Sequence, residues 1–318
     1  MPKPIVFMFS GQGSHYYQMG RELFEQLPLF KYWLIEADTI YKDITGLSIL
    51  KVLYDEGHKK SSPFTRTLFT HPAIYMVQYA LGQLLIEQGI RPDYTLGTSL
   101  GEFTAAVFAG ILTFETALIA IIKQAQIIEE RCGTGSMLAI LASPELYYSN
   151  PFIQATTELA ALNFDSHFIV SGSDLNLTAL ERYLASQNIN YQRLAVSHGF
   201  HSSLIDAAAS DYQYFISQLS LHVSSTPFIS CAYPEQVKMS SPIHFWNCIR
   251  LPIQFKATLE HLEKNDDYYY LDVGPSGTLA TFVQYNLKNS SSQSFRLITP
   301  YGDEANNCMK IIEYFTAC

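Results

Sequence analysis

One serine in the sequence stands in a setting that could make it a nucleophile. Ser99 is the central residue of the motif Gly-Thr-Ser-Leu-Gly at residues 97–101, which follows a short apolar segment and precedes an alanine-rich one. A sharp turn between a strand and a helix can hold a serine hydroxyl above the edge of a sheet, where flanking glycines prevent collisions. Taken alone, the motif is equally compatible with an ordinary glycine-rich turn. The flanking strand and helix favour the nucleophile.

A serine hydroxyl needs a neighbouring base to react at neutral pH. The best-placed candidates are His198 and His201, which stand three residues apart. Two histidines at this spacing could also bind a metal ion, but no cysteine or carboxylate stands near them at ligand spacing, so no metal site is predicted. A core histidine hydrogen-bonded to the backbone is the remaining alternative. The sequence contains nine histidines, so composition alone does not select the base.

A second glycine-rich loop, Gly-Gln-Gly-Ser, occupies residues 11–14. It follows a predicted strand and precedes a predicted helix, as dinucleotide-binding loops do, but the third glycine of that fingerprint would fall on Tyr16. Such a loop can also point a backbone N–H at the oxyanion that forms when a serine attacks a carbonyl. The residue after the nucleophile supplies the second donor. We therefore expect the backbone N–H groups of Gln12 and Leu100 to form an oxyanion hole.

The elements around these loops alternate between strand and helix. The hydrophobic pattern predicts strands at 4–9, 94–96 and 268–273, and helices at 17–26, 73–88, 102–109 and 203–219. This alternation favours a parallel sheet with helices on both faces. The most apolar window, residues 111–122, is too short to span a membrane and is predicted to be a core helix.

Residues 135–197 have a different pattern. Strands are expected at 136–141, 168–171 and 189–196, with a polar helix after the first strand and a helix at 175–186. This order is typical of a small split β-α-β unit inserted into a larger domain. We therefore predict an α/β protein in which residues 1–134 and 198–318 form the larger domain and residues 135–197 a smaller one.

Composition excludes several classes of protein. The chain has 318 residues, 48% of them hydrophobic, which is enough for a sizeable core. Its formal net charge of −9, with no run of like charges, argues against nucleic acid or an anionic membrane as the main partner. The five cysteines occur singly, as expected in a reducing compartment. A cytoplasmic protein is predicted.

Four separated motifs together resemble one enzyme family. They are Phe-Ser-Gly-Gln-Gly-Ser at 9–14, Gly-Thr-Ser-Leu-Gly-Glu at 97–102, Gly-Phe-His-Ser at 199–202 and Asp-Val-Gly-Pro at 272–275. In this order and spacing they resemble the malonyl-CoA:acyl carrier protein acyltransferases and the acyltransferase domains of polyketide synthases, over nearly the whole chain. The resemblance implies an α/β-hydrolase-like larger domain, an inserted ferredoxin-like α+β subdomain, and an active site in the cleft between them.

The resemblance also implies roles for single residues. Ser99 would carry the acyl group, and His201 would act as general base and then general acid. The family orients this histidine through a backbone carbonyl, which is expected here near Asn247. Asn163 matches an asparagine that lines the cleft. His198 and Phe200 match the pattern of members that select malonyl groups.

Other positions depart from the malonyl-transferring pattern. Where those members have an arginine that pairs with the substrate carboxylate, this sequence has Gln124, and a neutral amide cannot replace two charge-assisted hydrogen bonds. Lys123 is adjacent, but it points about 100° away on a helix. His71 stands where glutamine is usual, and Thr98 where histidine is usual. Because carboxylate binding needs charge, we give Gln124 more weight than His198 and Phe200.

With Gln124, the sequence looks similar to the free-standing acyl hydrolases of polyketide pathways that use separate acyltransferases. We therefore predict a serine acyl hydrolase that cleaves stalled, neutral acyl groups from the phosphopantetheine thioester of acyl carrier proteins. A genuine acyltransferase that moves an acyl group from CoA to carrier protein is the alternative. A catalytically inactive carrier-protein docking module is a third hypothesis, which the presence of Ser99 and His201 disfavours.

The predicted partners are acyl carrier proteins, with acyl-CoA as an alternative acyl donor. No bound cofactor is expected, because the 4′-phosphopantetheine arm arrives with the substrate. Carrier proteins are generally acidic, so an acidic enzyme must present a basic patch to them. Arg193, Arg250 and Lys256 are candidates for that patch.

Overall fold

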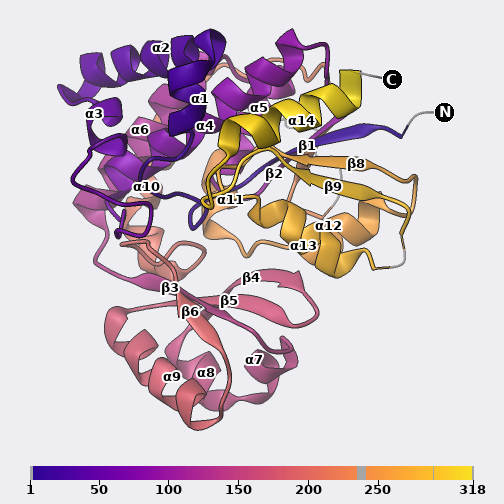
Figure 1. The fold of residues 1–318 in the computed structure, drawn as a ribbon. Helices are drawn as coiled ribbons and strands as arrows, with labels where there is room; N and C mark the ends of the chain where they lie inside the picture. Colours follow the sequence, from indigo (N-terminus) through magenta and orange to yellow (C-terminus); the bar gives the residue numbers. More distant parts are fainter. Residues whose placement is uncertain (1–2, 235–240, 289, 317–318) are drawn as a thin grey trace.

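A computed structural model describes residues 3–234, 241–288 and 290–316 of the chain. It contains two separate sheets, which Figure 1 shows in different parts of the molecule. The larger sheet is parallel throughout, with the order β7-β2-β1-β8-β9. Its strands are β1 Ile5–Phe9, β2 Tyr94–Gly97, β7 Phe228–Ser230, β8 Tyr269–Asp272 and β9 Gln293–Arg296. The predicted parallel α/β architecture is confirmed.

Helices cover both faces of the parallel sheet. One face carries the helices α1 Arg21–Gln26, α2 Pro28–Thr45, α3 Ile49–Leu53, α4 Thr67–Glu87, α5 Gly101–Phe108, α6 Phe114–Arg131, α10 Ala209–Ile216, α11 His244–Arg250 and α14 Glu304–Thr316. The other face carries α12 Phe255–Leu262 and α13 Thr278–Asn286. Successive residues of β1 accordingly face opposite cores: Phe7 and Phe9 pack in the first, Val6 and Met8 in the second.

The smaller sheet is antiparallel, with the order β4-β5-β3-β6. Its strands are β3 Ser136–Ile140, β4 Glu158–Phe164, β5 His167–Gly172 and β6 Tyr191–Arg193, and its helices are α7 Glu145–Ser149, α8 Pro151–Thr156 and α9 Asp174–Ser186. These helices lie on one face and enclose a core of their own (Figure 1). The strand order and directions are those of a ferredoxin-like unit, as predicted. All four strands lie within residues 135–197.

Several predicted elements differ in their bounds. The helix expected at 17–26 begins only at Arg21, because Gln18 and Gly20 have positive φ and form a turn. The stretch at 203–219 divides into a 3₁₀ turn, η1 Ser203–Ala208, and α10. The strand expected at 189–196 is paired only over Tyr191–Arg193. Strands β4, β7 and β9 were not predicted. None of the helices in the described part of the chain combines the length and apolarity needed to cross a bilayer.

Candidate active site

Ser99 lies at a strained turn between β2 and α5. Its φ is 54°, in the left-handed region that non-glycine residues rarely adopt, as is common for residues held at functional sites. The two flanking positions need glycine because a side chain there would collide with neighbouring atoms, not because their φ angles are positive. A Cβ on Gly101 would lie 2.0 Å from the carbonyl oxygen of Phe9, and one on Gly97 would lie 2.4 Å from the Cα of Glu102. The turn can therefore pass this close to β1 only with glycines.

The ring of His201 lies at hydrogen-bond distance from the hydroxyl of Ser99. The Nε2 atom of His201 lies 2.8 Å from the Oγ of Ser99, and its Nδ1 lies 2.6 Å from the carbonyl oxygen of Leu251. His201 also has positive φ, 59°, and its backbone N–H donates to the carbonyl of Ile249. The C-terminal end of α11 and the residue after it thus hold the backbone and the ring of His201. The predicted serine and histidine are brought together at hydrogen-bond distance.

The carbonyl that orients His201 is that of Leu251, so the expectation of Asn247 was wrong. The Asn247 carbonyl already accepts the N–H of Leu251, which closes the last turn of α11. Leu251 is the first residue beyond that helix and has an extended backbone, so its own carbonyl is free to turn toward His201. The Asn247 side chain instead donates to the hydroxyl of Tyr233.

The surroundings of His201 keep its ring neutral. Burial lowers its pKa to about 4, the hydrogen bond to the Leu251 carbonyl opposes this shift, and the charge of Arg250 adds to it. In the neutral ring, Nδ1–H donates to Leu251 and leaves Nε2 as an acceptor. Nε2 can then take the proton of the Ser99 hydroxyl, which is the geometry a general base requires.

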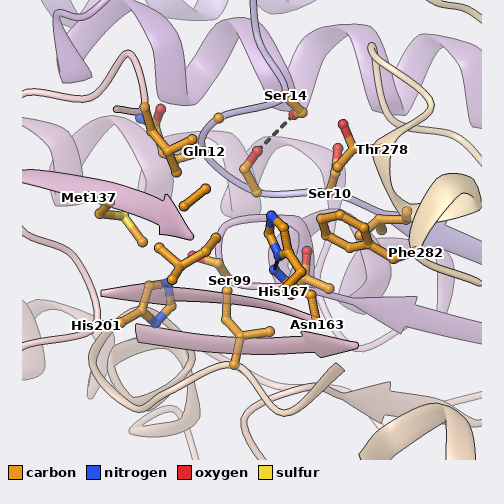
Figure 2. A pocket seen from close by; sticks show the side chains of 18 of the residues that line it. Ser10, Gln12, Ser14, Ser99, Met137, Asn163, His167, His201, Thr278 and Phe282 are labelled. Carbon is orange, nitrogen blue, oxygen red and sulfur yellow. Dashed lines mark hydrogen bonds between the residues drawn. The ribbon is translucent and has the colours of Figure 1, made fainter. Parts of the chain in front are cut away.

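The first glycine-rich loop packs directly against the serine turn. A Cβ on Gly11 would lie 2.8 Å from the Cβ of Ser99 and 3.3 Å from the backbone nitrogen of Leu100. The hydroxyl of Ser14 donates to the carbonyl of Gly11 and closes this loop (Figure 2). Loop and turn therefore lie side by side, where N–H groups of both could meet one oxygen. The oxyanion role of Gln12 and Leu100 stays a prediction.

A cavity of about 260 Å³ opens in front of Ser99 between the two sheets. Figure 2 shows it with the serine turn and residues of the smaller sheet around it. Ser99 and His201 line it together with Ser10, Gly11, Gln12, Gly13, Ser14, Thr98, Met137, Ala139, Asn163, His167, Ile169, Gln192, Leu194, Ile253, Thr278, Leu279 and Phe282. Asn163 is thus placed in the cavity, as predicted. Within residues 3–234, 241–288 and 290–316, no lysine, arginine or carboxylate lines the cavity.

Four predicted substrate-binding residues are not among the residues that line this cavity, so their role in binding the substrate stays a prediction. These four residues are all buried: Phe200, and three polar residues here called the inner polar group, Gln124, His71 and His198. His71 lies on α4 and Gln124 on α6, two helices that pack on each other and on α5, whereas His198 and Phe200 lie in the loop before η1. The rings of His71 and Phe200 lie 5.2 Å apart, and those of Phe200 and His198 lie 6.2 Å apart.

The inner polar group is neutral. Burial lowers the pKa of His71 to about 3, and it also lowers the pKa of His198. Within the described part of the chain, both ring nitrogens of His71 and both amide atoms of Gln124 lack a hydrogen-bond partner. Gln12 connects this group to the cavity, because it lines the cavity and its amide nitrogen donates to Thr70, next to His71. Polar but uncharged groups therefore lie behind the nucleophile.

Glu102, which follows the serine motif, belongs to a second buried site that the sequence did not reveal. Its carboxylate accepts hydrogen bonds from Ser230 at 2.8 Å and from the Nε2 of His244 at 2.5 Å. Glu102 lies in the first turn of α5, Ser230 on β7 and His244 on α11. The acid nearest the nucleophile in sequence thus pairs with His244, whereas the catalytic candidate His201 pairs with a carbonyl.

The three basic residues proposed for a docking patch are each paired with acids. Arg193 binds Glu181 and Asp174, Arg250 binds Asp206 and Glu158, and Lys256 binds Asp165 and Glu260. Each candidate thus has acidic neighbours, and its contribution to a docking patch stays a prediction. Over the described ranges, no cluster of histidine, cysteine and carboxylate side chains could hold a metal ion. Cys132, Cys231, Cys248 and Cys308 are free thiols, and Cys318 lies outside the described residues.

Comparison with known proteins agrees with this geometry. The acyl transferase domain family matches residues 6–317. The chain is 43% identical over 312 residues to the polyketide biosynthesis acyltransferase homolog BaeD of Bacillus velezensis, which covers 98% of this chain and 96% of BaeD. It is also 41% identical over 316 residues to the homolog PksD of Bacillus subtilis, a match that covers 99% of this chain and 97% of PksD.

A solved structure with a similar fold is the malonyl CoA-acyl carrier protein transacylase from Coxiella burnetii. The TM-score is 0.81 over 99% of both chains, at 22% identity, which supports a shared fold. The serine turn, the histidine held by a carbonyl and the two-sheet architecture thus agree with the match over residues 6–317. The chain belongs to the acyl transferase domain family.

Proposed function

We propose that this protein is a serine acyl hydrolase that releases neutral acyl groups from the phosphopantetheine thioester of acyl carrier proteins in polyketide biosynthesis. One observation carries the proposal: Ser99 and its base face a cavity that, among the described residues, is lined by no lysine or arginine. A malonyl carboxylate bound there would lose its hydration without gaining an opposite charge, at a cost of several kcal/mol. A neutral acyl chain carries no such cost.

The inner polar group supports the same preference for neutral substrates. Gln124 is a buried amide, and His71 and His198 have lowered pKa values, so none of them supplies a positive charge at neutral pH. An acyl group on Ser99 that extended toward them past Gln12 would meet hydrogen-bonding but uncharged atoms. Acetyl and other short neutral acyl groups fit this environment better than malonyl.

The proposed mechanism has two steps. The Oγ of Ser99 attacks the thioester carbonyl while Nε2 of His201 accepts the hydroxyl proton. The C–S bond then breaks, and His201 returns that proton to the departing pantetheine thiolate. In the second step a water molecule gives a proton to Nε2 and attacks the acyl-serine ester. The C–Oγ bond then breaks, and Nε2 returns that proton to Oγ, which releases the carboxylic acid and restores Ser99 and His201. The backbone N–H groups of Gln12 and Leu100 stabilise the oxyanion in both steps.

The partner of this reaction is an acyl-loaded carrier protein, and acyl-CoA is an alternative acyl donor because it carries the same thioester arm. The chemistry needs no resident cofactor or metal. The polyketide assignment rests on the relatives named as polyketide biosynthesis acyltransferase homologs. The single, unpaired cysteines favour a cytoplasmic location.

The test compares acetyl- and malonyl-loaded carrier protein by intact mass. The proposal predicts faster appearance of free carrier-protein thiol from the acetyl form, with no such release by Ser99→Ala. Rapid transfer of malonyl from CoA to carrier protein with little hydrolysis would instead show the acyltransferase alternative. Unchanged thioester cleavage by Ser99→Ala would refute the serine mechanism and favour a docking module.

A further inference from the structure

A second histidine, His167, lies in the cavity opposite the nucleophile. It begins β5, just after the turn from β4, and lines the cavity together with Ser99 and His201. Its ring stacks on Phe164 with centroids 5.0 Å apart and packs on Phe282 at 5.3 Å. Figure 2 shows the ring projecting among the lining residues. The mechanism proposed above does not use this group.

Asn163 fixes which nitrogen of His167 carries the proton. The amide nitrogen of Asn163 lies 2.9 Å from the Nδ1 of His167, and because an amide nitrogen can only donate, Nδ1 must accept. Burial lowers the pKa of His167 to about 4, so the ring is neutral near pH 7. A neutral ring that accepts at Nδ1 carries its hydrogen on Nε2. His167 is therefore a hydrogen-bond donor at Nε2.

The surroundings of this donor are rigid and mostly apolar. Asn163 is buried, and its backbone carbonyl accepts from Asn286 on α13, which ties the β4–β5 turn to the larger domain. The walls beside it carry Met137, Ile169, Leu194, Ile253, Leu279 and Phe282. A fixed donor in such a wall binds an acceptor without an ordering cost and strengthens the hydrogen bond by excluding water.

The exposure of the lining residues places His167 toward the mouth of the cavity. Ser99 and His201 are buried, whereas His167, Thr278 and Phe282 are partly exposed, and Gly13 and Gln192 are exposed. A thioester arm therefore reaches Ser99 through a mouth whose rim includes His167. In a phosphopantetheine arm, the strong neutral acceptors behind the thioester are two amide carbonyls. These are the groups that an Nε2–H donor at this place would meet.

We propose that His167, held by Asn163, is a substrate-binding residue whose Nε2–H donates to an amide carbonyl of the pantetheine arm. This inference rests on the proposed function, because it takes its ligand from that reaction. His167 and Asn163 then select thioesters carried on pantetheine over simple esters. The nucleophile and base act on the acyl end of the same molecule.

The kinetic test uses His167→Phe, which keeps the stacking ring but removes the donor, and His167→Gln, which returns an N–H donor. The substrates are acetyl-pantetheine and p-nitrophenyl acetate, which lacks amide carbonyls. For acetyl-pantetheine, His167→Phe should raise KM about fivefold with little change in kcat, as expected for one neutral hydrogen bond. The rise in KM for p-nitrophenyl acetate should be several times smaller, and His167→Gln should recover most of the loss. His222→Phe, at an exposed histidine outside the cavity, is the matched control.

Two further measurements separate this inference from the proposed hydrolysis. Binding of acetyl-pantetheine to Ser99→Ala, by calorimetry, should weaken about fivefold when His167→Phe is added, whatever the turnover. Nitrogen-15 NMR of labelled histidines should show the Nε2–H form for the signal that disappears in His167→Phe. Equal losses with both substrates, unchanged binding, or an Nδ1–H form would overturn the inference. Absence of hydrolysis by the wild-type enzyme would refute only the proposed function.

Discussion

Two buried histidines on neighbouring segments have opposite kinds of partner. His201 bonds through Nδ1 to the carbonyl of Leu251 and through Nε2 to Ser99. His244, at the start of α11, bonds through Nε2 to the carboxylate of Glu102. A serine-histidine-acid triad would place the carboxylate behind the catalytic histidine. Here the carboxylate is behind the histidine that does not contact the serine.

This difference shows that a histidine can be oriented by a partner that carries no charge. A carbonyl is enough to fix the ring and tautomer of His201, and it leaves the ring neutral and ready to accept a proton. The Glu102–His244 pair instead joins α5, which follows Ser99, to α11. The carbonyls of Ile249, in the last turn of α11, and of Leu251, just after it, hold the base. Glu102 and His244 are therefore assigned a positioning role, whereas Ser99 and His201 are the residues proposed to react.

Removal of the catalytic histidine should have the largest effect on activity. His201→Ala should lower kcat for acetyl-carrier protein by about 10⁴-fold, because the serine then has no base. Circular dichroism and the melting temperature should show that the variant remains folded. A loss of less than tenfold would mean that another group activates Ser99.

Glu102→Gln should act mainly on stability. It removes the charge from a fully buried, hydrogen-bonded group, so the free energy of unfolding should fall by about 3 kcal/mol in urea denaturation. The folded fraction should lose less activity than His201→Ala, because the reacting atoms remain. Glu260→Gln, at an exposed carboxylate paired with Lys256, should change stability by less than about 1 kcal/mol. A loss of activity equal to that of His201→Ala, at unchanged stability, would assign a chemical role to Glu102.

The pH dependence should follow the carbonyl-bound histidine. Because the pKa of His201 is about 4, the acylation rate should stay level from about pH 8 to pH 5 and fall below that as Nε2 becomes protonated. An unfolded histidine has a pKa near 6.5, so the unfolded chain binds more protons between pH 6.5 and 4, and stability should fall as the pH falls through this window. His15, His71 and His167, whose pKa values are also lowered, add to that loss.

Initial rates taken before unfolding, together with urea denaturation at pH 7 and pH 5, measure the two effects separately. A rate that halves near pH 6.5 would show that His201 is not desolvated as the structure indicates.

The smallest effect is expected at Asn247. Its carbonyl closes α11 and its side chain donates to Tyr233, so Asn247→Ala should leave kcat within about threefold of the wild type and cost about 1 kcal/mol of stability. Steady-state kinetics on acetyl-carrier protein give the first value and urea denaturation the second. A hundredfold fall in kcat would show that Asn247 contributes to orienting the His201 ring.

The sequence predicted the parts of the site that depend on local motifs. Ser99 and its glycines form one contiguous turn, so their role is visible in the order of residues. The identity of the orienting carbonyl was not predictable, because it depends on α11 ending at Arg250 and leaving Leu251 extended. His167 was missed because it reaches the cavity only through the pairing of β4 with β5. Gln124 was expected at the substrate; it is buried and is not among the residues that line the cavity, so this role stays a prediction.

The same reasoning applies to the fold. Strands β1 and β2 have apolar residues beside glycine turns, and both were predicted. Strand β4, Glu158–Phe164, is rich in alanine and leucine, and β9, Gln293–Arg296, is polar, so neither has a strand-like pattern. Their structure is decided by pairing with β5 and β8, which are contacts that local propensity does not encode.

The most direct test of the proposed reaction follows oxygen from water. Acetyl-carrier protein is incubated with the wild-type enzyme in ¹⁸O-labelled water. The masses of the released acetate and of the carrier protein are then measured by mass spectrometry. Hydrolysis through Ser99 predicts one ¹⁸O atom in each acetate, one free thiol for each acetate, and neither product with Ser99→Ala. Acetyl groups that leave the carrier protein only when a second thiol is added, without labelled acetate, would contradict it.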